Sequence, residues 1–195
     1  KKSIVTGGTR GLGQAYAVAM AKAGAALFIP TVADDDGTTN ELIEAEGRRC
    51  EIVTADLTVT GTPAEVVQGC VETLGGVDIV VNNAGYIWHS AIHNMSDEQW
   101  DAMIDIHASA QFRILRAYGR WLRGNAGPDS PTRKVVNISS TMGVHGGATQ
   151  LAYSAGKAAV VGITKTLAKE WGRFNVTVNA VAFGAIETRL TSPYE

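Results

Sequence analysis

The chain has 195 residues, 45% of them hydrophobic and 18% charged, with a formal net charge of −2. This size and composition predict one globular domain over residues 1–195. The chain lacks the basic footprint of a nucleic-acid-binding protein, and Lys22 and Gly24 interrupt its most apolar window, residues 15–29, which is too short to span a membrane. We therefore expect neither a nucleic-acid nor a membrane partner.

Cysteine usage and the start of the chain bear on location. Cys50 and Cys70 show neither CxxC nor Cys/His ligand spacing, so we predict no metal site, and two thiols in a domain of this size suggest a reducing compartment. Lys1 and Lys2 stand directly before an apolar strand, with no visible signal peptide. These features favour a cytoplasmic protein.

Short β-branched runs alternate with longer helical patterns along the chain. The runs predict strands at 3–6, 26–32, 49–54, 77–81, 134–139 and 175–181, and the patterns predict helices at 11–23, 38–46, 63–74, 97–123 and 153–171. Several strands are apolar throughout, as a sheet covered on both faces requires. We predict a doubly wound, Rossmann-type α/β fold with a mostly parallel sheet and helices on both faces.

The boundaries of the long fourth helix carry recognisable signals. Ser96 and Gln99 have the spacing of a capping box, in which each side chain bonds the backbone of the other. Gly124 and Gly127 end the helical pattern, and a loop with two prolines follows, to about residue 132. We expect one continuous helix between these signals.

The first strand runs into a glycine-rich turn, T-G-G-T-R-G-L-G at residues 6–13, and then into a helix. Glycines let a backbone approach a pyrophosphate closely, and the free amides of a helix N-terminus attract its charge. An ordinary glycine-rich turn is the alternative, and the strand–turn–helix context argues against it. We predict a dinucleotide site with these contacts: Gly7, Thr9, Arg10, Gly11, Leu12 and Gly13.

Three further motifs follow in order: D-L at 56–57, N-N-A-G at 82–85, and Y-x-x-x-K at 153–157. Together with the G-x-x-x-G-x-G spacing of the first turn, they resemble the short-chain dehydrogenase/reductase family over residues 3–190. The resemblance implies a nicotinamide dinucleotide and an oxidoreductase activity. It also implies that the adenosine side of the cofactor is held by Asp56, Leu57, Asn83, Ala84 and Gly85.

The end of the second strand bears on the choice between NAD and NADP. An acidic side chain there would bond the ribose 2′-hydroxyl and repel a 2′-phosphate, and the chain has Thr31 at this position. In the family, a basic residue at the place of Arg10 often pairs with the 2′-phosphate. These two residues favour NADP(H), whereas a three-residue shift of the strand end would place Asp34 at the ribose and favour NAD(H).

Tyr153 and Lys157 stand at i and i+4, so they share one face of a helix. A nearby ammonium and an oxidised nicotinamide both favour the phenolate of the tyrosine. The resemblance implies that Tyr153 protonates the substrate carbonyl oxygen, that Lys157 binds the nicotinamide ribose, and that Ser140 bonds the reacting oxygen. Ser139 is the runner-up for this serine, and because strand residues alternate faces we assign it a structural role.

The family usually has an asparagine in the long helix, within a water-linked proton relay from the lysine. His107 stands at this position. A buried structural histidine is the alternative, but an imidazole can hold a water or pass a proton near neutral pH. We place His107 in the relay.

The segment after the sixth strand resembles the family's segment over the nicotinamide. Ile186 and Thr188 would hold the carboxamide, and Phe183 replaces the usual proline, which leaves this loop less constrained.

Residues 147–157 look most like bacterial 3-oxoacyl-acyl-carrier-protein reductases, which implies NADP(H)-dependent interconversion of a ketone, as a 3-oxoacyl thioester, and a secondary alcohol. His107 favours an alternative, an NAD-dependent hydroxyacyl-CoA or hydroxysteroid dehydrogenase. A third possibility is an inactive dinucleotide-sensing regulator. We expect substrate contacts from residues 86–89, Met142, Val144, His145, Gln150 and Leu151.

Family members usually continue to about 250 residues, so we expect the C-terminal lid and last strand to be absent from this chain. In the family the long helix and the helix from Tyr153 pair across subunits, which implies a homotetramer or homodimer.

Overall fold

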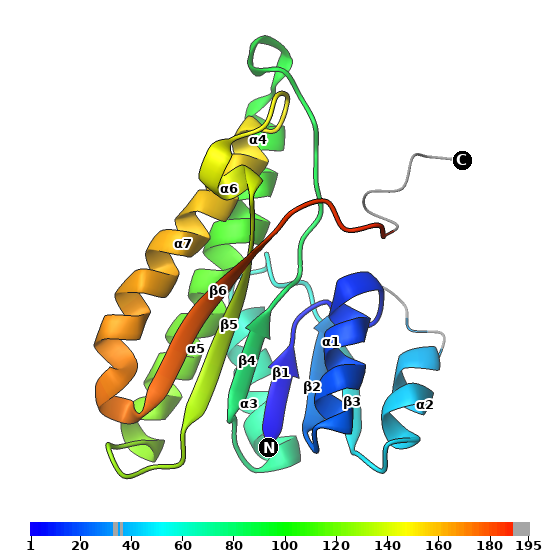
Figure 1. The fold of residues 1–195 in the computed structure, drawn as a ribbon, viewed down its shortest axis with the longest axis vertical. Coiled ribbons are helices and arrows are strands. Elements are labelled where there is room, and N and C mark those ends of the chain that lie inside the picture. The colour runs from blue at the N-terminus through cyan, green and yellow to red at the C-terminus, as the bar shows by residue number, and fades with distance from the viewer. Residues whose placement is uncertain (33–34, 36, 189–195) are drawn as a thin grey trace.

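A six-stranded parallel sheet forms the centre of the molecule. The computed structural model describes residues 1–32, 35 and 37–188, so Asp34 and residues 189–195 lie outside the described part. The strand order is β3-β2-β1-β4-β5-β6, and every neighbouring pair is parallel (Figure 1). The strands are β1 Lys2–Val5, β2 Ala26–Thr31, β3 Cys50–Thr54, β4 Ile79–Asn82, β5 Arg133–Ser140 and β6 Val176–Phe183.

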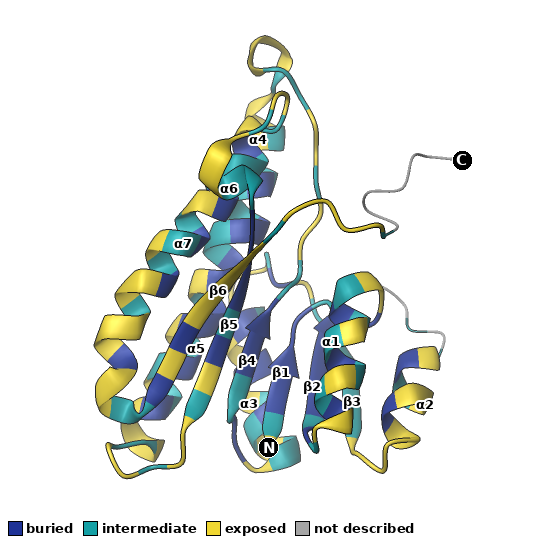
Figure 2. Cartoon of the chain, in the orientation of Figure 1, coloured by how far each residue is buried: buried dark blue, intermediate teal, exposed yellow. Residues whose placement is uncertain are grey.

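Helices cover both faces of this sheet, and an apolar cluster lies between the helices and the strands on each face. On one face α1 and α2 bury Ala17, Ala21 and Ile43 against the strands. On the other face lie α3, α5 and α7 (Figures 1 and 2). They bury a larger cluster that includes Tyr118 and Trp171. The predicted doubly wound fold is therefore confirmed. These helices are α1 Gly11–Lys22, α2 Thr38–Glu44, α3 Thr62–Leu74, α5 Ala110–Asn125 and α7 Leu151–Trp171.

The helix predicted at 97–123 is not one regular helix. It begins as α4 (Asp97–Ile104) behind the predicted capping box of Ser96 and Gln99, which is confirmed. It then passes through a π-helical segment, Asp105–Ser109, before α5 begins at Ala110. Sequence periodicity did not reveal this interruption, because a single π turn changes the apolar pattern by only one residue.

Other boundaries differ by a few residues from the predictions. The fourth strand lies at Ile79–Asn82 instead of 77–81, and α7 begins at Leu151, two residues before Tyr153. A short helix α6 (Met142–His145) and the 3₁₀ turns Ile92–Asn94 and Gly172–Phe174 were not predicted. No helix in the described part of the chain is long and apolar enough to cross a membrane.

The strand order places a topological switch point between β1 and β4. The chain moves outward from β1 through β2 to β3, and then returns to the opposite side of β1 with β4. In open α/β sheets, ligands bind in the crevice outside the carboxyl ends of the strands at such a point. The glycine-rich turn after β1 and the N-N-A-G segment, which begins with the last residue of β4, lie at this place.

Candidate active site

A cleft of about 550 Å³ opens at the carboxyl ends of the strands. It brings together every residue that the sequence analysis named as catalytic or cofactor-binding: Gly7, Thr9, Arg10, Gly11, Leu12, Gly13, Thr31, Asp56, Leu57, Asn83, Ala84, Gly85, His107, Ser140, Tyr153, Lys157, Ile186 and Thr188. Several apolar residues also line the cleft, and they belong to no motif that sequence reasoning could use: Pro30, Val32, Ala55, Ile106 and Ile138.

The glycine-rich turn forms one end of the cleft from backbone atoms. Gly7 and Gly11 have φ of 63° and 55°, in the left-handed region that favours glycine. A Cβ on Gly13 would lie 2.1 Å from the Gly7 carbonyl oxygen, so the start of α1 can approach β1 this closely only with glycine there. A Cβ on Gly11 would meet nothing within 4 Å. This open, side-chain-free cradle at a helix N-terminus fits a dinucleotide pyrophosphate.

Asn83 and Thr6 hold the cradle in place. The Thr6 hydroxyl accepts hydrogen bonds from the amides of Asn83 (2.9 Å) and Ala84 (3.0 Å). In return, the Asn83 side-chain amide donates to the carbonyl oxygens of Thr6 (3.0 Å) and Gly7 (3.2 Å). The N-N-A-G segment therefore has a direct structural role, in fixing the glycine turn against β4.

Thr31 and Arg10 lie where the second strand meets the glycine turn. The hydroxyls of Thr31 and Thr9 are 3.1 Å apart and share a hydrogen bond. Arg10 is exposed at the mouth of the cleft, and its side chain makes no hydrogen bond that caps α1. A guanidinium in this place can reach an anionic group bound beside Thr31.

Tyr153, Lys157 and Ser140 gather at the opposite end of the cleft. Burial raises the pKa of Tyr153, and a hydrogen bond with the Ser140 side chain lowers it in part. The chain's own groups thus keep Tyr153 a neutral phenol, and the phenolate expected from the sequence needs the positive charge of an oxidised nicotinamide as well.

Lys157 is only 4% exposed, and its ammonium donates a hydrogen bond to the Ile138 carbonyl oxygen at 2.8 Å. Burial lowers the pKa of Lys157 to about 8, and Nζ lies 5.7 Å from the centre of the Tyr153 ring. The lysine therefore still carries a positive charge close to the phenol at neutral pH.

The two serines of β5 take different places. The Ser139 hydroxyl donates to the Lys157 carbonyl oxygen at 2.8 Å, which fastens β5 to α7. The Ser140 oxygen accepts from the amide of Met142 at 3.1 Å, and the Ser140 side chain lowers the pKa of Tyr153. The structure thus directs Ser140 toward the tyrosine and gives Ser139 a packing contact with α7.

His107 lies in the π-helical segment and is 1% exposed. Its Nε2 lies 2.7 Å from the Tyr86 carbonyl oxygen, so this nitrogen carries the proton and Nδ1 is left as an acceptor. Nδ1 is buried and has no hydrogen-bond partner among the described residues. The ring meets the Tyr153 ring edge to face, with centroids 5.0 Å apart.

Burial and the charge of Lys157 lower the pKa of His107 to about 3, so the imidazole is neutral at pH 7. Two glycines make room for this ring. A Cβ on Gly85 would lie 2.4 Å from His107 Cε1, and a Cβ on Gly156 would lie 2.8 Å from His107 Cβ. Gly156 could have indicated from the sequence that α7 leaves room for a bulky side chain, but this inference requires knowing that α7 packs against the π turn.

A second polar bridge supports the strand ends. The side-chain amide of Asn82 donates to the side-chain oxygen of Asn137 at 2.9 Å, and the side-chain amide of Asn137 donates to the Thr164 hydroxyl at 2.9 Å. Sequence reasoning missed this bridge, because it joins residues that are far apart in the chain.

Phe183 pairs with Ser140 across β5 and β6, in place of the proline expected from the resemblance. It is the last residue of β6, its carbonyl oxygen accepts from the Thr141 amide at 2.9 Å, and its ring stacks on Tyr16 with centroids 6.3 Å apart. These contacts restrain the segment that proline would otherwise stiffen.

Among the residues expected to touch substrate, Tyr86 lines the cleft. The described residues hold no group of three or more His, Cys, Asp or Glu side chains arranged to bind a metal ion.

Comparison with known proteins agrees with this geometry. The family model of the short chain dehydrogenases matches residues 1–195. The uncharacterized oxidoreductase YgcW of Escherichia coli is 38% identical, over 98% of this chain and 71% of that protein. The 3-oxoacyl-acyl-carrier-protein reductase FabG of Chlamydia muridarum is 33% identical, over 98% of this chain and 76% of that protein.

A solved structure is similar as well. A short chain dehydrogenase from Mycobacterium avium superposes with a TM-score of 0.89 at 32% identity, over 99% of this chain and 70% of that one.

Proposed function

The chain belongs to the short-chain dehydrogenase family, and we propose that it interconverts a ketone and a secondary alcohol with Tyr153 as the acid and base. The observation that carries this proposal is the convergence of Tyr153, Ser140 and Lys157 on one end of the cleft. When bound, a reduced nicotinamide supplies the hydride that the carbonyl carbon receives.

In the reducing direction, Ser140 and Tyr153 hold the carbonyl oxygen through hydrogen bonds. Tyr153 then releases its hydroxyl proton to this oxygen as the new carbon–hydrogen bond forms, so the C=O bond becomes a C–OH bond. The ammonium of Lys157 stabilises the phenolate that remains. In the oxidising direction, Tyr153 takes the proton back.

The phenolate must recover a proton before the next turnover, and we assign this step to Lys157 and His107. A neutral imidazole cannot store a proton at pH 7, because the pKa of His107 is about 3. The Nδ1 lone pair of His107 can instead accept a hydrogen bond from a water beside Lys157. This water passes protons from solvent. His107 is thus a positioning residue for the relay.

The cofactor end is assigned as follows. Gly7, Thr9, Gly11, Leu12 and Gly13 receive the pyrophosphate, and Lys157 also bonds the nicotinamide ribose. Asp56 and Leu57, backed by residues 83–85, hold the adenine side, and Ile186 with Thr188 holds the carboxamide. This assignment is supported by the position of all these groups on one cleft.

We propose NADP(H) as the preferred cofactor, with NAD(H) as the alternative. The support is a hydroxyl at Thr31, where an acidic residue would repel a 2′-phosphate, and the exposed Arg10 beside it. Adenosine 2′,5′-bisphosphate and AMP should bind with a clear preference for the bisphosphate in calorimetry, and Arg10→Ala should reduce that preference about tenfold. Equal affinities in the unchanged protein would favour NAD(H).

For the substrate, we propose a 3-oxoacyl thioester, supported by the similarity to the Chlamydia muridarum reductase. An NAD-dependent hydroxyacyl-CoA or hydroxysteroid dehydrogenase is the second candidate, favoured by His107. Turnover of acetoacetyl thioesters by the full-length protein with NADPH and with NADH separates the two. We also propose a cytoplasmic homodimer or homotetramer, supported by the exposed Phe112 on α5 and by the free thiols of Cys50 and Cys70.

The decisive experiment replaces Tyr153 with phenylalanine. We expect Tyr153→Phe to lower kcat for carbonyl reduction about 10³-fold while cofactor binding persists, because only the acidic hydroxyl is lost. Tyr118→Phe is the matched control, since Tyr118 lies fully buried in the core away from the cleft. Unchanged reduction by Tyr153→Phe would refute the mechanism, and dinucleotide binding with no turnover by the wild type would favour a sensing regulator.

A further inference from the structure

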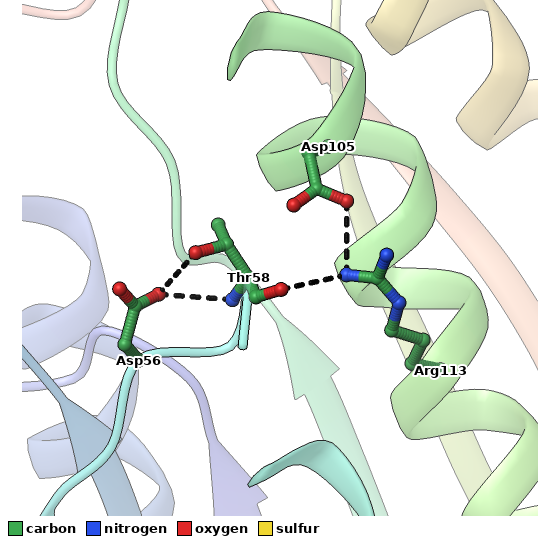
Figure 3. Close-up of polar contacts among 4 residues, drawn as sticks. All are labelled: Asp56, Thr58, Asp105 and Arg113. Atoms are coloured by element: carbon green, nitrogen blue, oxygen red, sulfur yellow. Dashed lines mark hydrogen bonds and ion pairs between the residues drawn. The ribbon is translucent and has the colours of Figure 1, made fainter. Parts of the chain in front are cut away.

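A chain of polar contacts joins the loop after β3 to the π-helical segment that carries His107 (Figure 3). A carboxylate oxygen of Asp56 accepts hydrogen bonds from the amide (2.9 Å) and the hydroxyl (2.7 Å) of Thr58. The Thr58 carbonyl oxygen then accepts a hydrogen bond from Nη1 of Arg113 at 3.0 Å. The same nitrogen lies 2.9 Å from the carboxylate of Asp105.

Arg113 is the centre of this bridge. Its Nη1 carries two hydrogens, so one nitrogen can donate both to the Thr58 carbonyl and to Asp105. The side chains of Arg113 and Asp105 are 23% and 32% exposed, so solvent screens the pair only in part. The guanidinium therefore connects the loop after β3 with the π-helical segment.

The π turn makes the ion pair possible. In a regular α-helix, residues eight positions apart are separated by about 80° around the axis. Hydrogen bonding from i to i+5 widens the turn and reduces the rotation per residue, which brings Asp105 round toward the face of Arg113. Asp105 begins this segment and His107 follows two positions later. The ion pair with Asp105 therefore holds Arg113 to the segment close to His107.

We propose that Arg113 is a positioning residue that couples the adenosine end of the cleft to the catalytic end. The inference rests on the proposed function, in which Asp56 and Leu57 hold the adenine. Binding there orders the Asp56–Thr58 turn and strengthens the hold of the Thr58 carbonyl on Arg113. Arg113 then steadies Asp105 and, with it, the His107 ring against Tyr153.

The test is amide hydrogen exchange of the full-length protein with and without saturating AMP, which occupies only the adenosine end. We expect AMP to slow exchange at residues 55–58 and, by about fivefold, at residues 105–109. In Arg113→Met, AMP should still protect 55–58 but should no longer protect 105–109. Arg116→Met is the matched control, because Arg116 lies one turn away on α5 and stacks over Phe112 instead.

Asp105→Ala gives an independent second test, since it releases the π segment while Arg113 can keep its bond to the Thr58 carbonyl. It should lose the protection at 105–109 in the same way, and it keeps the inference testable if Arg113→Met does not fold. Undiminished AMP protection of 105–109 in either variant would overturn the inference.

The wild type separates two kinds of failure. If AMP protects 55–58 and leaves 105–109 unchanged, the coupling is refuted while the proposed cofactor placement stands. If AMP binds without protecting 55–58, the placement of adenine is refuted, and the inference is overturned with it.

Discussion

The two ends of the cleft differ in the groups that line them. At the end near β1 to β3, the glycine-rich turn lines the cleft, and its shape depends on the missing side chains of Gly7 and Gly13. At the end near β5 and α7, the lining includes polar side chains that are buried, with His107 at 1% and Lys157 at 4% exposure. The first end therefore depends on steric fit, and the second on electrostatics.

This contrast agrees with the role proposed for each end. A pyrophosphate brings its own charge and needs free amides with room to approach them. A proton donor needs a pKa suited to its reaction, and burial shifts a pKa far more strongly than solvent-exposed neighbouring charges can. Substitutions at the two ends should consequently differ in whether their effects depend on pH.

His107 offers the strongest test of the electrostatic end. Its pKa is lowered from 6.5 to about 3, so between these pH values the unfolded chain binds a proton that the folded chain does not. Its contribution to stability is complete above pH 6.5 and is lost as pH falls, by about 5 kcal/mol at pH 3. In urea unfolding from pH 7.5 downward, His107→Asn should lose less stability than the wild type. Parallel curves would contradict the buried neutral imidazole.

Lys157 should show a dependence in the same direction, a stability that rises with pH, but in the alkaline range. Its pKa is lowered from 10.5 to about 8, so between these values the unfolded chain holds the proton that the folded chain has released. The stability of the wild type relative to Lys157→Met should therefore rise by about 3 kcal/mol from pH 8 to pH 10.5. Lys165→Met controls for loss of an exposed lysine from the same helix. A relative stability that stays flat across this window would argue against burial of the ammonium.

Gly13→Ala tests the steric end. The added Cβ would lie 2.1 Å from the Gly7 carbonyl oxygen and 2.6 Å from the Asn83 side-chain nitrogen, so α1 must move away from the turn. We expect a loss of about 2–3 kcal/mol in thermal unfolding, similar at pH 6 and pH 9, together with weaker AMP binding. In the control Gly124→Ala the new Cβ meets nothing within 4 Å, and we expect a gain of about 0.5–1 kcal/mol. A Gly13→Ala protein as stable as the wild type would mean that the turn adapts.

Asp56→Asn should give the smallest effect on stability. An amide oxygen can still accept the hydrogen bonds of Thr58, and these bonds are exposed, so we expect a change within about 0.5 kcal/mol. AMP affinity should fall all the same, because an amide replaces the carboxylate proposed to bond the adenine. A large loss of stability would show that the adenosine end, too, depends on a charged side chain.

Much of this molecule was readable in its sequence because the signals are local. Alternating β-branched runs and helical periods gave the parallel doubly wound sheet, and Ser96 with Gln99 marked a helix start at the residue where α4 begins. The predicted site residues from the motifs at 7–13, 56–57 and 83–85, together with Tyr153 and Lys157, all line one cleft. They do so because the carboxyl ends of parallel strands meet at one edge of the sheet.

Tertiary structure decided what depends on contacts between distant segments. The π turn at Asp105–Ser109 leaves almost no trace in the apolar pattern, and only the fold shows that Gly85 and Gly156 make room for His107 there. The neutral state of His107, the lowered pKa of Lys157 and the bridge from Asp56 to Asp105 through Arg113 all arise from burial and long-range packing. The sequence thus named the candidate reacting groups by type and spacing, and the fold determined their burial and their protonation, because both depend on what surrounds each group in space.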